Sequence, residues 1–220
     1  PHIPALIEKS ESADSKWLAA ADAIRTTDTF AKAASRQTNI GDTNITITGI
    51  AKGSGMIAPD MATMLCFIAT DADLPSAILQ DVLSRFTDQS FNAITVDGDT
   101  STSDTVIMVA TASAKHPPVA SAHDDVLADF CASLKSLMVE LATLIVRDGE
   151  GATKLIQINV SGADHDAAAK RIGLTIGNSP LVKTAIAGED ANWERFSLPL
   201  GKPAKKPDRN NFEFPFGAVR

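Results

Sequence analysis

Cysteine is scarce in this sequence, with Cys66 and Cys131 as the two examples among 220 residues. Two cysteines alone build neither a disulfide framework nor a four-cysteine zinc site. Because each lies in an apolar run, we expect two buried, reduced thiols. None of the four histidines has a partner at the spacing of a metal site or of a serine–histidine–aspartate triad. We therefore assign the histidines no role and predict no metal.

Long apolar runs and basic runs are also missing. No stretch approaches the roughly 20 apolar residues that a membrane span needs, and the longest apolar helix, residues 126–146, is interrupted by Asp129, Lys135 and Glu140. No basic segment followed by an apolar one opens the chain, so no signal peptide is visible. Twenty Lys and Arg residues against 27 Asp and Glu residues give a net charge of −7. We therefore expect neither a membrane nor a nucleic acid as partner.

The chain nevertheless has the composition of a globular protein. Hydrophobic residues make up 44% and charged residues 21% of it, which excludes disorder as the main state. The first residue is not methionine, and residues 214–220 have the pattern of a strand that stops midway. We expect the sequence to be part of a longer protein, incomplete at both ends.

Hydrophobic periodicity predicts alternating helices and strands. Helices are expected over residues 15–24, 75–86, 124–147 and 167–176, the last of them capped by Asp164 or Asp166. Strands are expected over residues 44–50, 64–70, 105–111, 153–161, 196–200 and 212–216. With no internal repeat and no clear boundary, this alternation predicts a single α/β or layered α+β domain over residues 1–220.

A glycine loop leads through the turn at Pro59 to Thr63, at the start of an apolar strand. A hydroxyl on such a rigid edge is held as a nucleophile must be. The simpler interpretation is that Thr63 is present for its β-propensity. The loop is not a phosphate-binding P-loop, because Lys52 precedes the glycines instead of following them.

Residues 95–105 combine several hydroxyl groups with the carboxylates of Asp97, Asp99 and Asp104. An EF-hand is excluded, because its turn glycine would fall on Thr102 and its bidentate glutamate on Met108. A remote alternative is a phosphohydrolase with Asp97 as nucleophile and Asp99 as acid–base. The simpler interpretation is a turn held by hydrogen bonds from side chains to backbone.

Glu150 lies between two glycines at the junction that follows the longest predicted helix. A carboxylate in that place could face a cleft and hold a substrate ammonium group. The alternative interpretation is a solvated acidic residue of a turn.

Taken together, these segments resemble the ornithine acetyltransferase family, the glutamate N-acetyltransferases of the cyclic arginine pathway. The resemblance extends from about Trp17 to Trp193. Its ordered blocks are residues 26–29, 52–65, 95–105, 147–154, 178–185 and 188–193. It implies an αββα sandwich and a chain that cuts itself between Ala62 and Thr63. It also implies that Thr63 then carries the acetyl group.

The resemblance implies ping-pong transfer of acetyl from N-acetylornithine to glutamate, with Thr26, Lys52, Thr63 and Glu150 at the substrate. After cleavage, the α-amine of Thr63 would act as base for its own hydroxyl, because its reference pKa is about 7.7–8.0. Our own hypotheses are that Lys52 binds the α-carboxylate shared by both amino acids and that Glu150 binds an ammonium group.

The resemblance implies no cofactor, although acetyl-CoA is possible as an alternative acetyl donor. It further implies an assembly with two copies of each processed subunit, in the cytoplasm. The family's oxyanion-hole Thr-Gly pair and its C-terminal pocket residues fall outside this sequence, and Glu194 stands where the family usually has glycine. A non-catalytic, unprocessed fragment or scaffold of the same fold is therefore the alternative function.

Overall fold

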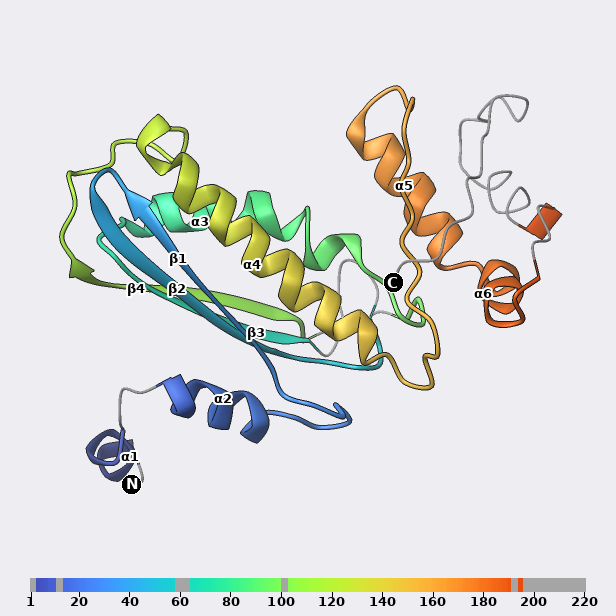
Figure 1. Cartoon of the computed structure of the whole chain (residues 1–220), viewed down its shortest axis with the longest axis horizontal. Helices are drawn as coiled ribbons and strands as arrows, with labels where there is room; N and C mark the ends of the chain where they lie inside the picture. Colours follow the sequence, from blue (N-terminus) through green and yellow to red (C-terminus); the bar gives the residue numbers. More distant parts are fainter. Residues whose placement is uncertain (1–2, 11–13, 58–63, 100–102, 191–193, 196–220) are drawn as a thin grey trace.

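A computed structural model describes residues 3–10, 14–57, 64–99, 103–190 and 194–195 (Figure 1). Its strands are β1 (Lys32–Ile40), β2 (Thr43–Lys52), β3 (Leu65–Ala72) and β4 (Thr105–Ala114). Its helices are α1 (Ile3–Glu8), α2 (Asp14–Ala23), α3 (Ser76–Thr87), α4 (Ala128–Arg147), α5 (Asp166–Gly177) and α6 (Pro180–Ala187), with 3₁₀ turns at Phe91–Ala93 (η1) and Asp125–Leu127 (η2).

The four strands form one sheet in the order β1-β2-β3-β4. The β1–β2 and β2–β3 pairs are antiparallel and the β3–β4 pair is parallel. Register places Lys52 opposite Leu65, and Leu65 opposite Thr105. The start of β1 reaches the same end of the sheet, which we call the Lys52 end. The opposite end, where Gly41 turns β1 into β2, is the Gly41 end.

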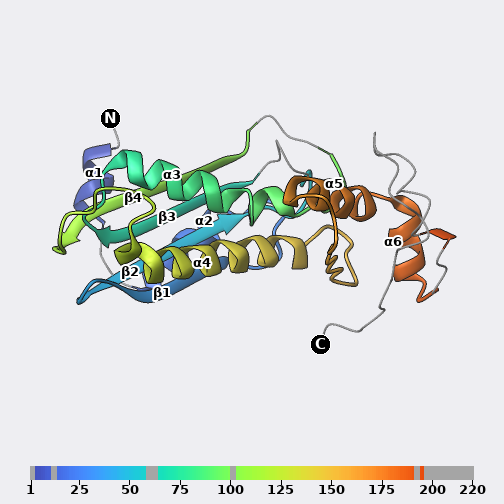
Figure 2. The same ribbon diagram turned by 90° about the horizontal axis from the view of Figure 1, so that it is seen from above.

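Helices α3 and α4 lie side by side on one face of the sheet, and α2 lies against the other (Figures 1 and 2). Helix α4 presents a fully buried apolar stripe to β1 and β2, made of Phe130, Leu134, Leu137, Met138, Leu141 and Ile145. Burying each such side chain stabilises the fold by about 1.5–3 kcal/mol. A Cβ at Gly49 of β2 would lie 2.9 Å from a methyl of Leu141. Glycine therefore lets α4 approach the sheet closely.

Helices α5 and α6 lie beyond the Lys52 end of the sheet (Figures 1 and 2). They share a small apolar cluster of Ile176, Val182 and Ala185, against which Ile158 packs. The Nζ atom of Lys183 donates to the carbonyl of Val96 at 2.5 Å, which ties α6 to the segment before β4.

The structure confirms the predicted layered α/β class and the four predicted helices. It also confirms the strands predicted at 44–50, 64–70 and 105–111. The αββα arrangement implied by the resemblance has two sheets, and the described residues contain one. The strands predicted at 196–200 and 212–216 lie outside the described residues.

Two sequence predictions are wrong. Residues 153–161 form no strand, although Ile156, Ile158 and Val160 alternate as a strand would. The side chains of Ile158 and Val160 pack toward α5 instead, with their Cγ2 atoms close to Gly173. The cap of α5 is neither Asp164 nor Asp166. It is His165, whose Nδ1 accepts the N–H of Ala168 at 3.1 Å.

No helix among the described residues is both long enough and apolar enough to cross a membrane.

Candidate functional site

The Lys52 end of the sheet brings three sequence-predicted substrate residues together from distant parts of the chain. The Nζ atom of Lys52, the last residue of β2, donates to Thr26 Oγ1 at 3.4 Å. The N–H of Glu150 donates to the carbonyl of Ser54 at 2.9 Å. A Cβ placed on Gly55 would lie 2.9 Å from the carboxyl carbon of Glu150, so the carboxylate rests on that glycine. Thr26, Lys52 and Glu150 thus surround one loop, residues 53–57.

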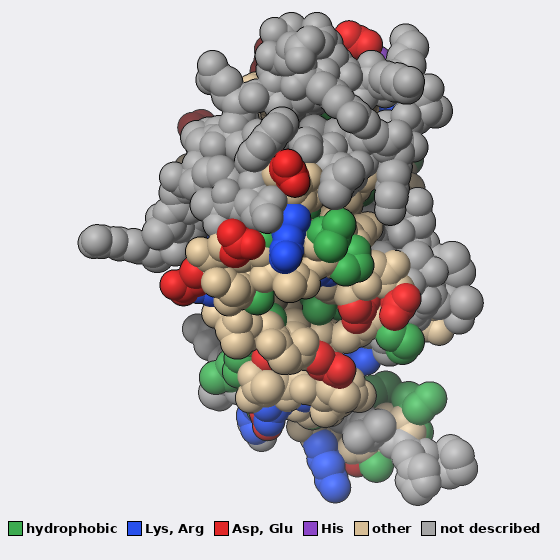
Figure 3. Space-filling model, turned by 90° about the vertical axis from the view of Figure 1, so that its right-hand side faces the viewer, with side chains coloured by type: hydrophobic (Ala, Val, Ile, Leu, Met, Phe, Trp, Pro, Cys, Tyr) green, Lys and Arg blue, Asp and Glu red, His purple; other side chains and the backbone are tan. Residues whose placement is uncertain are grey.

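The burial of the three residues differs. Lys52 is 5% exposed, while Thr26 and Glu150 are exposed. A buried ammonium beside two accessible polar side chains is a suitable arrangement for an anionic group of a small ligand. Figure 3 views the molecule from this side, and basic and acidic side chains are interspersed over its described part.

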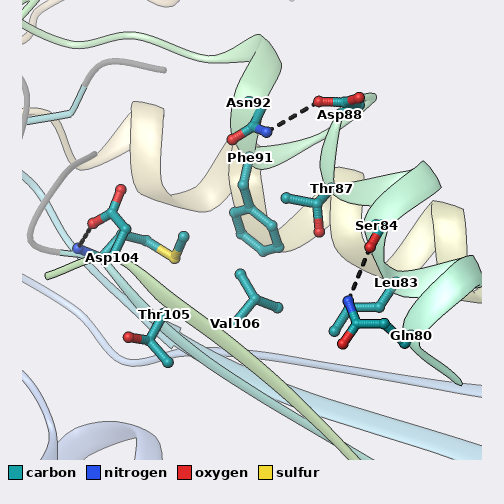
Figure 4. A pocket seen from close by; sticks show the side chains of 11 residues that line it. Gln80, Leu83, Ser84, Thr87, Asp88, Phe91, Asn92, Asp104, Thr105 and Val106 are labelled. Atoms are coloured by element: carbon teal, nitrogen blue, oxygen red, sulfur yellow. Dashed lines mark hydrogen bonds between the residues drawn. The ribbon is translucent and has the colours of Figure 1, made fainter. Parts of the chain in front are cut away.

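Ala62 and Thr63, the predicted cleavage residues, lie outside the described residues, but both flanks of residues 58–63 are described. The backbone N–H groups of Met56 and Ile57 donate to the carboxylate of Asp97 at 2.7 and 3.1 Å. On the other side, the N–H of Met64 donates to Asp104 Oδ1 at 2.7 Å (Figure 4). The segment 95–105 therefore anchors the chain on both sides of residues 58–63.

The contacts of Asp97 favour the turn interpretation over the phosphohydrolase. Besides Met56 and Ile57, it accepts the N–H of Asp99 at 3.0 Å. Both of its carboxylate oxygens are thus occupied by backbone donors. A carboxylate used in this way holds a loop and is a poor candidate for an aspartyl nucleophile.

A buried ionic network that no sequence motif predicts lies at the Lys52 end. The Nζ atom of Lys32 lies 2.6 Å from a carboxylate oxygen of Asp28 and 2.6 Å from one of Asp148. The side chains are 0%, 0% and 2% exposed for Lys32, Asp28 and Asp148. Lysine and aspartate are almost never fully buried unless they are paired. From the local sequence these three residues are therefore expected at the surface, and nothing there marks them as interior.

The two carboxylates of this network are held ionised. Burial by itself would raise the pKa of Asp28, but the Gly53 N–H and the Lys32 ammonium keep that pKa below its usual value. Burial likewise opposes ionisation of Asp148, and hydrogen bonds from Lys32 and Thr29 keep its pKa low. Hydrogen bonds to the charged form outweigh desolvation in both cases.

A hollow of the described surface lies elsewhere on the Lys52 end, between α3, η1 and the start of β4 (Figure 4). Its volume is about 480 Å³, and Met64 and Asp104 line one side of it. Thr26, Lys52 and Glu150 do not line it. We place the candidate site at the three predicted substrate residues, because they converge on one loop. Among the described residues that line the hollow, the charged ones are Asp88 and Asp104.

The cysteines offer no alternative nucleophile. Cys66 is fully buried and burial raises the pKa of its thiol, while Cys131 is half-buried; both are free thiols. The structure thus confirms two unpaired cysteines, with Cys131 less buried than expected. No group of three potential metal-ligating side chains occurs in the part of the chain that the structure describes.

Known proteins resemble this chain over most of its length. The family model described as "ArgJ family" matches residues 1–220. The chain belongs to the ArgJ family. Its ArgJ relatives include the "Arginine biosynthesis bifunctional protein ArgJ" of Gluconobacter oxydans, 55% identical over 203 residues, or 92% of this chain and 48% of that protein. The ArgJ protein of Agrobacterium fabrum is 53% identical over 93% of this chain and 50% of its own length.

A solved structure supports the fold assignment. The crystal structure of the arginine biosynthesis bifunctional protein ArgJ from Bacillus halodurans matches with a TM-score of 0.57 and 45% sequence identity. The match covers 60% of this chain and 62% of that one. The present chain spans about half the length of the curated ArgJ relatives named above.

Proposed function

We propose that the protein is a self-processing acetyltransferase of arginine biosynthesis, which moves acetyl from N-acetylornithine to glutamate through an acetyl-Thr63 intermediate. The observation that carries the proposal is the convergence of Thr26, Lys52 and Glu150 on the loop that leads toward Thr63. Membership of the ArgJ family supports it.

The processing step uses Thr63 as nucleophile. Its hydroxyl oxygen attacks the carbonyl carbon of Ala62 and the peptide C–N bond breaks, so the acyl group moves to oxygen and the α-amine takes up a proton. Water then hydrolyses the ester and releases the Ala62 carboxylate. The freed amine, with a reference pKa of about 7.7–8.0, is neutral often enough near pH 7 to serve as base for the hydroxyl.

The transfer step places the acetyl group on the same oxygen. Thr63 attacks the acetyl carbonyl of N-acetylornithine, the amide C–N bond breaks and ornithine leaves with a proton. The amine of glutamate then attacks the acetyl ester and regenerates the hydroxyl. We assign the Lys52 ammonium to the α-carboxylate common to both amino acids and the Glu150 carboxylate to the ammonium group of ornithine.

Intact-mass analysis of protein expressed from the natural gene tests the processing step. The wild type should give two pieces, one ending at Ala62 and one beginning at Thr63. Thr63→Ala should stay whole and transfer no acetyl, whereas Thr111→Ala, a threonine of β4, should be cleaved like the wild type. A wild type that stays whole and is never labelled by N-[¹⁴C]acetylornithine refutes the proposal and favours the unprocessed scaffold.

Lys52→Ala tests the binding assignment. We expect the KM for N-acetylornithine to rise by at least about tenfold, because a charge-assisted hydrogen bond contributes about 1.5–3 kcal/mol. Normal binding of N-acetylornithine by this variant refutes the role given to Lys52.

The remaining family features are part of the same proposal. They are a cytoplasmic location, an assembly with two copies of each processed subunit and independence of any cofactor. Whether acetyl-CoA also donates acetyl is a separate measurement, in which the thioester replaces N-acetylornithine in the same assay.

A further inference from the structure

Every carboxylate oxygen of the buried network of Asp28, Lys32 and Asp148 accepts a hydrogen bond from Thr26, Thr29 or Gly53, and those of Asp28 reach the candidate site directly. Asp28 Oδ1 accepts the N–H of Gly53 at 2.6 Å, and Asp28 Oδ2 accepts the N–H of Thr26 at 3.2 Å. One carboxylate therefore holds the backbone of Thr26 and of the residue that follows Lys52.

Asp148 makes the matching contacts from the end of α4. Its Oδ2 accepts the N–H of Thr29 at 2.9 Å, and its Oδ1 accepts the Thr29 hydroxyl. Asp148 lies two residues before Glu150, whose N–H bonds to Ser54 in the loop after Lys52. The hydroxyl of Ser54 in turn pairs with Thr27 Oγ1 at 2.8 Å.

The Lys32 ammonium joins the two halves of this arrangement. It is bonded to both carboxylates and lies 4.7 Å from the centre of the Phe30 ring. One buried cation thereby connects three segments that are remote in sequence, residues 26–29, 52–54 and 148–150. Each of these segments carries one of the proposed substrate residues.

Stability alone is a weak explanation for such a cluster. Well-packed apolar residues in place of a buried ion pair are often as stable or more stable, because desolvation of the charges offsets their attraction. What apolar residues cannot do is accept the backbone N–H groups of Thr26, Thr29 and Gly53. The directional contacts therefore point to positioning.

We propose that Asp28, Lys32 and Asp148 are positioning residues for substrate binding: they set the spacing of Thr26, Lys52 and Glu150 without touching substrate. This inference rests on the proposed function. Asp28 has the larger effect, because it bonds directly to the backbone at Thr26 and next to Lys52. Asp148 acts one step further away, through Thr29 and through the turn that leads to Glu150.

The test compares three Asp→Asn variants in protein expressed from the natural gene. Asp28→Asn and Asp148→Asn each leave one lysine paired with one aspartate, so a neutral buried pair remains and both variants should fold. The matched control is Asp71→Asn. Asp71 also accepts a backbone N–H within the sheet, that of Thr46 at 2.8 Å, but toward the Gly41 end.

The readouts are the processed fraction by intact mass, the melting temperature, and KM and kcat on processed protein. For Asp28→Asn we expect normal processing, a KM for N-acetylornithine raised about tenfold and a kcat within about threefold of wild type. Such a split indicates lost ground-state binding. Asp148→Asn should raise KM about threefold, and Asp71→Asn should leave KM unchanged whatever its melting temperature.

Three outcomes overturn the inference. They are a KM for Asp28→Asn within twofold of wild type, a KM change that Asp71→Asn reproduces, and an Asp28→Asn protein that folds but is not processed. An active wild type beside unaffected variants defeats this inference alone. A wild type without acetyl transfer defeats the proposed function, and the inference with it.

Discussion

The two ends of the sheet hold their lysine–aspartate pairs in opposite ways. At the Lys52 end, Lys32 bonds to Asp28 and Asp148 at 2.6 Å with side chains 0–2% exposed. At the Gly41 end, Lys115 bonds to Asp73 at 2.9 Å with side chains 73% and 46% exposed. The same chemical pair is thus shielded from water at one end and solvated at the other.

The difference shows what burial adds to an ion pair. Water screens the Lys115–Asp73 pair, and such exposed pairs contribute about 0–1 kcal/mol. The carboxylates around Lys32 are shielded from water, and each of their oxygens accepts a hydrogen bond from Thr26, Thr29 or Gly53. The buried network fixes the positions of the backbone groups that are bonded to it, whereas the exposed Lys115–Asp73 pair has no need to fix any.

Removing each lysine gives the largest expected contrast between the ends. Lys32→Met leaves two carboxylates buried without their cation, and breaking a buried pair in this way costs about 3–5 kcal/mol. Lys115→Met should cost no more than about 1 kcal/mol. Urea unfolding at pH 7 measures both, and equal losses from the two variants would break the comparison.

Lowering the pH should reveal the same contrast between the two ends of the sheet, with a smaller loss of folding stability. The pKa values of Asp28 and Asp148 are lowered in the folded state. Unfolded chains therefore take up protons first, near the reference pKa of about 3.9, and the folded state loses stability as pH falls below about 4 through the lowered values. Above about pH 5 this contribution is fully present.

Urea midpoints between pH 7 and pH 2.5 measure the acid effect. The wild type should lose stability more steeply below pH 4 than Asp28→Asn, which has one such carboxylate fewer. Parallel curves for the wild type and Asp28→Asn would contradict the lowered pKa of Asp28.

Gly55→Ala should change the free energy of unfolding only slightly, while still displacing the Glu150 carboxylate at the Lys52 end. The new Cβ would lie 2.9 Å from the carboxyl of Glu150, the far end of a flexible and exposed side chain that can move aside. We expect the free energy of unfolding to change by less than about 1 kcal/mol, and the KM for N-acetylornithine to rise several-fold as Glu150 is displaced.

Gly173→Ala is the control for that prediction. Its Cβ would meet Val160 at 3.7 Å, an ordinary contact in α5 away from the site. Its KM should equal that of the wild type. A normal KM for Gly55→Ala would show that the position of the Glu150 carboxylate does not matter for binding.

The amino-acid sequence alone determined the elements whose pattern is strong. The apolar stripe of α4 and the alternation of Ile45 and Ile47 in β2 have the periods of a helix and a strand, and the structure confirms both. The sequence does not predict strand β1, because the residues Ala33-Ala34-Ser35-Arg36-Gln37 carry little β-branched or aromatic signal. It forms because β2 supplies a full ladder of partners.

Residues 153–161 show how a periodic pattern by itself gives a wrong prediction. Alternation of Ile156, Ile158 and Val160 satisfies the period of a strand, but a strand exists only where a neighbour completes its hydrogen bonds. Among the described residues no strand pairs with this segment, and α5 takes up the side chains of Ile158 and Val160 instead. Local pattern therefore could not decide this segment.

For the site, the family resemblance predicts Thr26, Lys52 and Glu150 as substrate residues, because the motifs that carry the resemblance are local and contiguous. Tertiary structure alone decided that these three meet at the Lys52 end and that Lys32 is buried between Asp28 and Asp148. The reason is physical: a lysine and an aspartate 116 residues apart carry no trace of each other in the sequence. Only the packing of α4 across the sheet removes the water that would otherwise separate them.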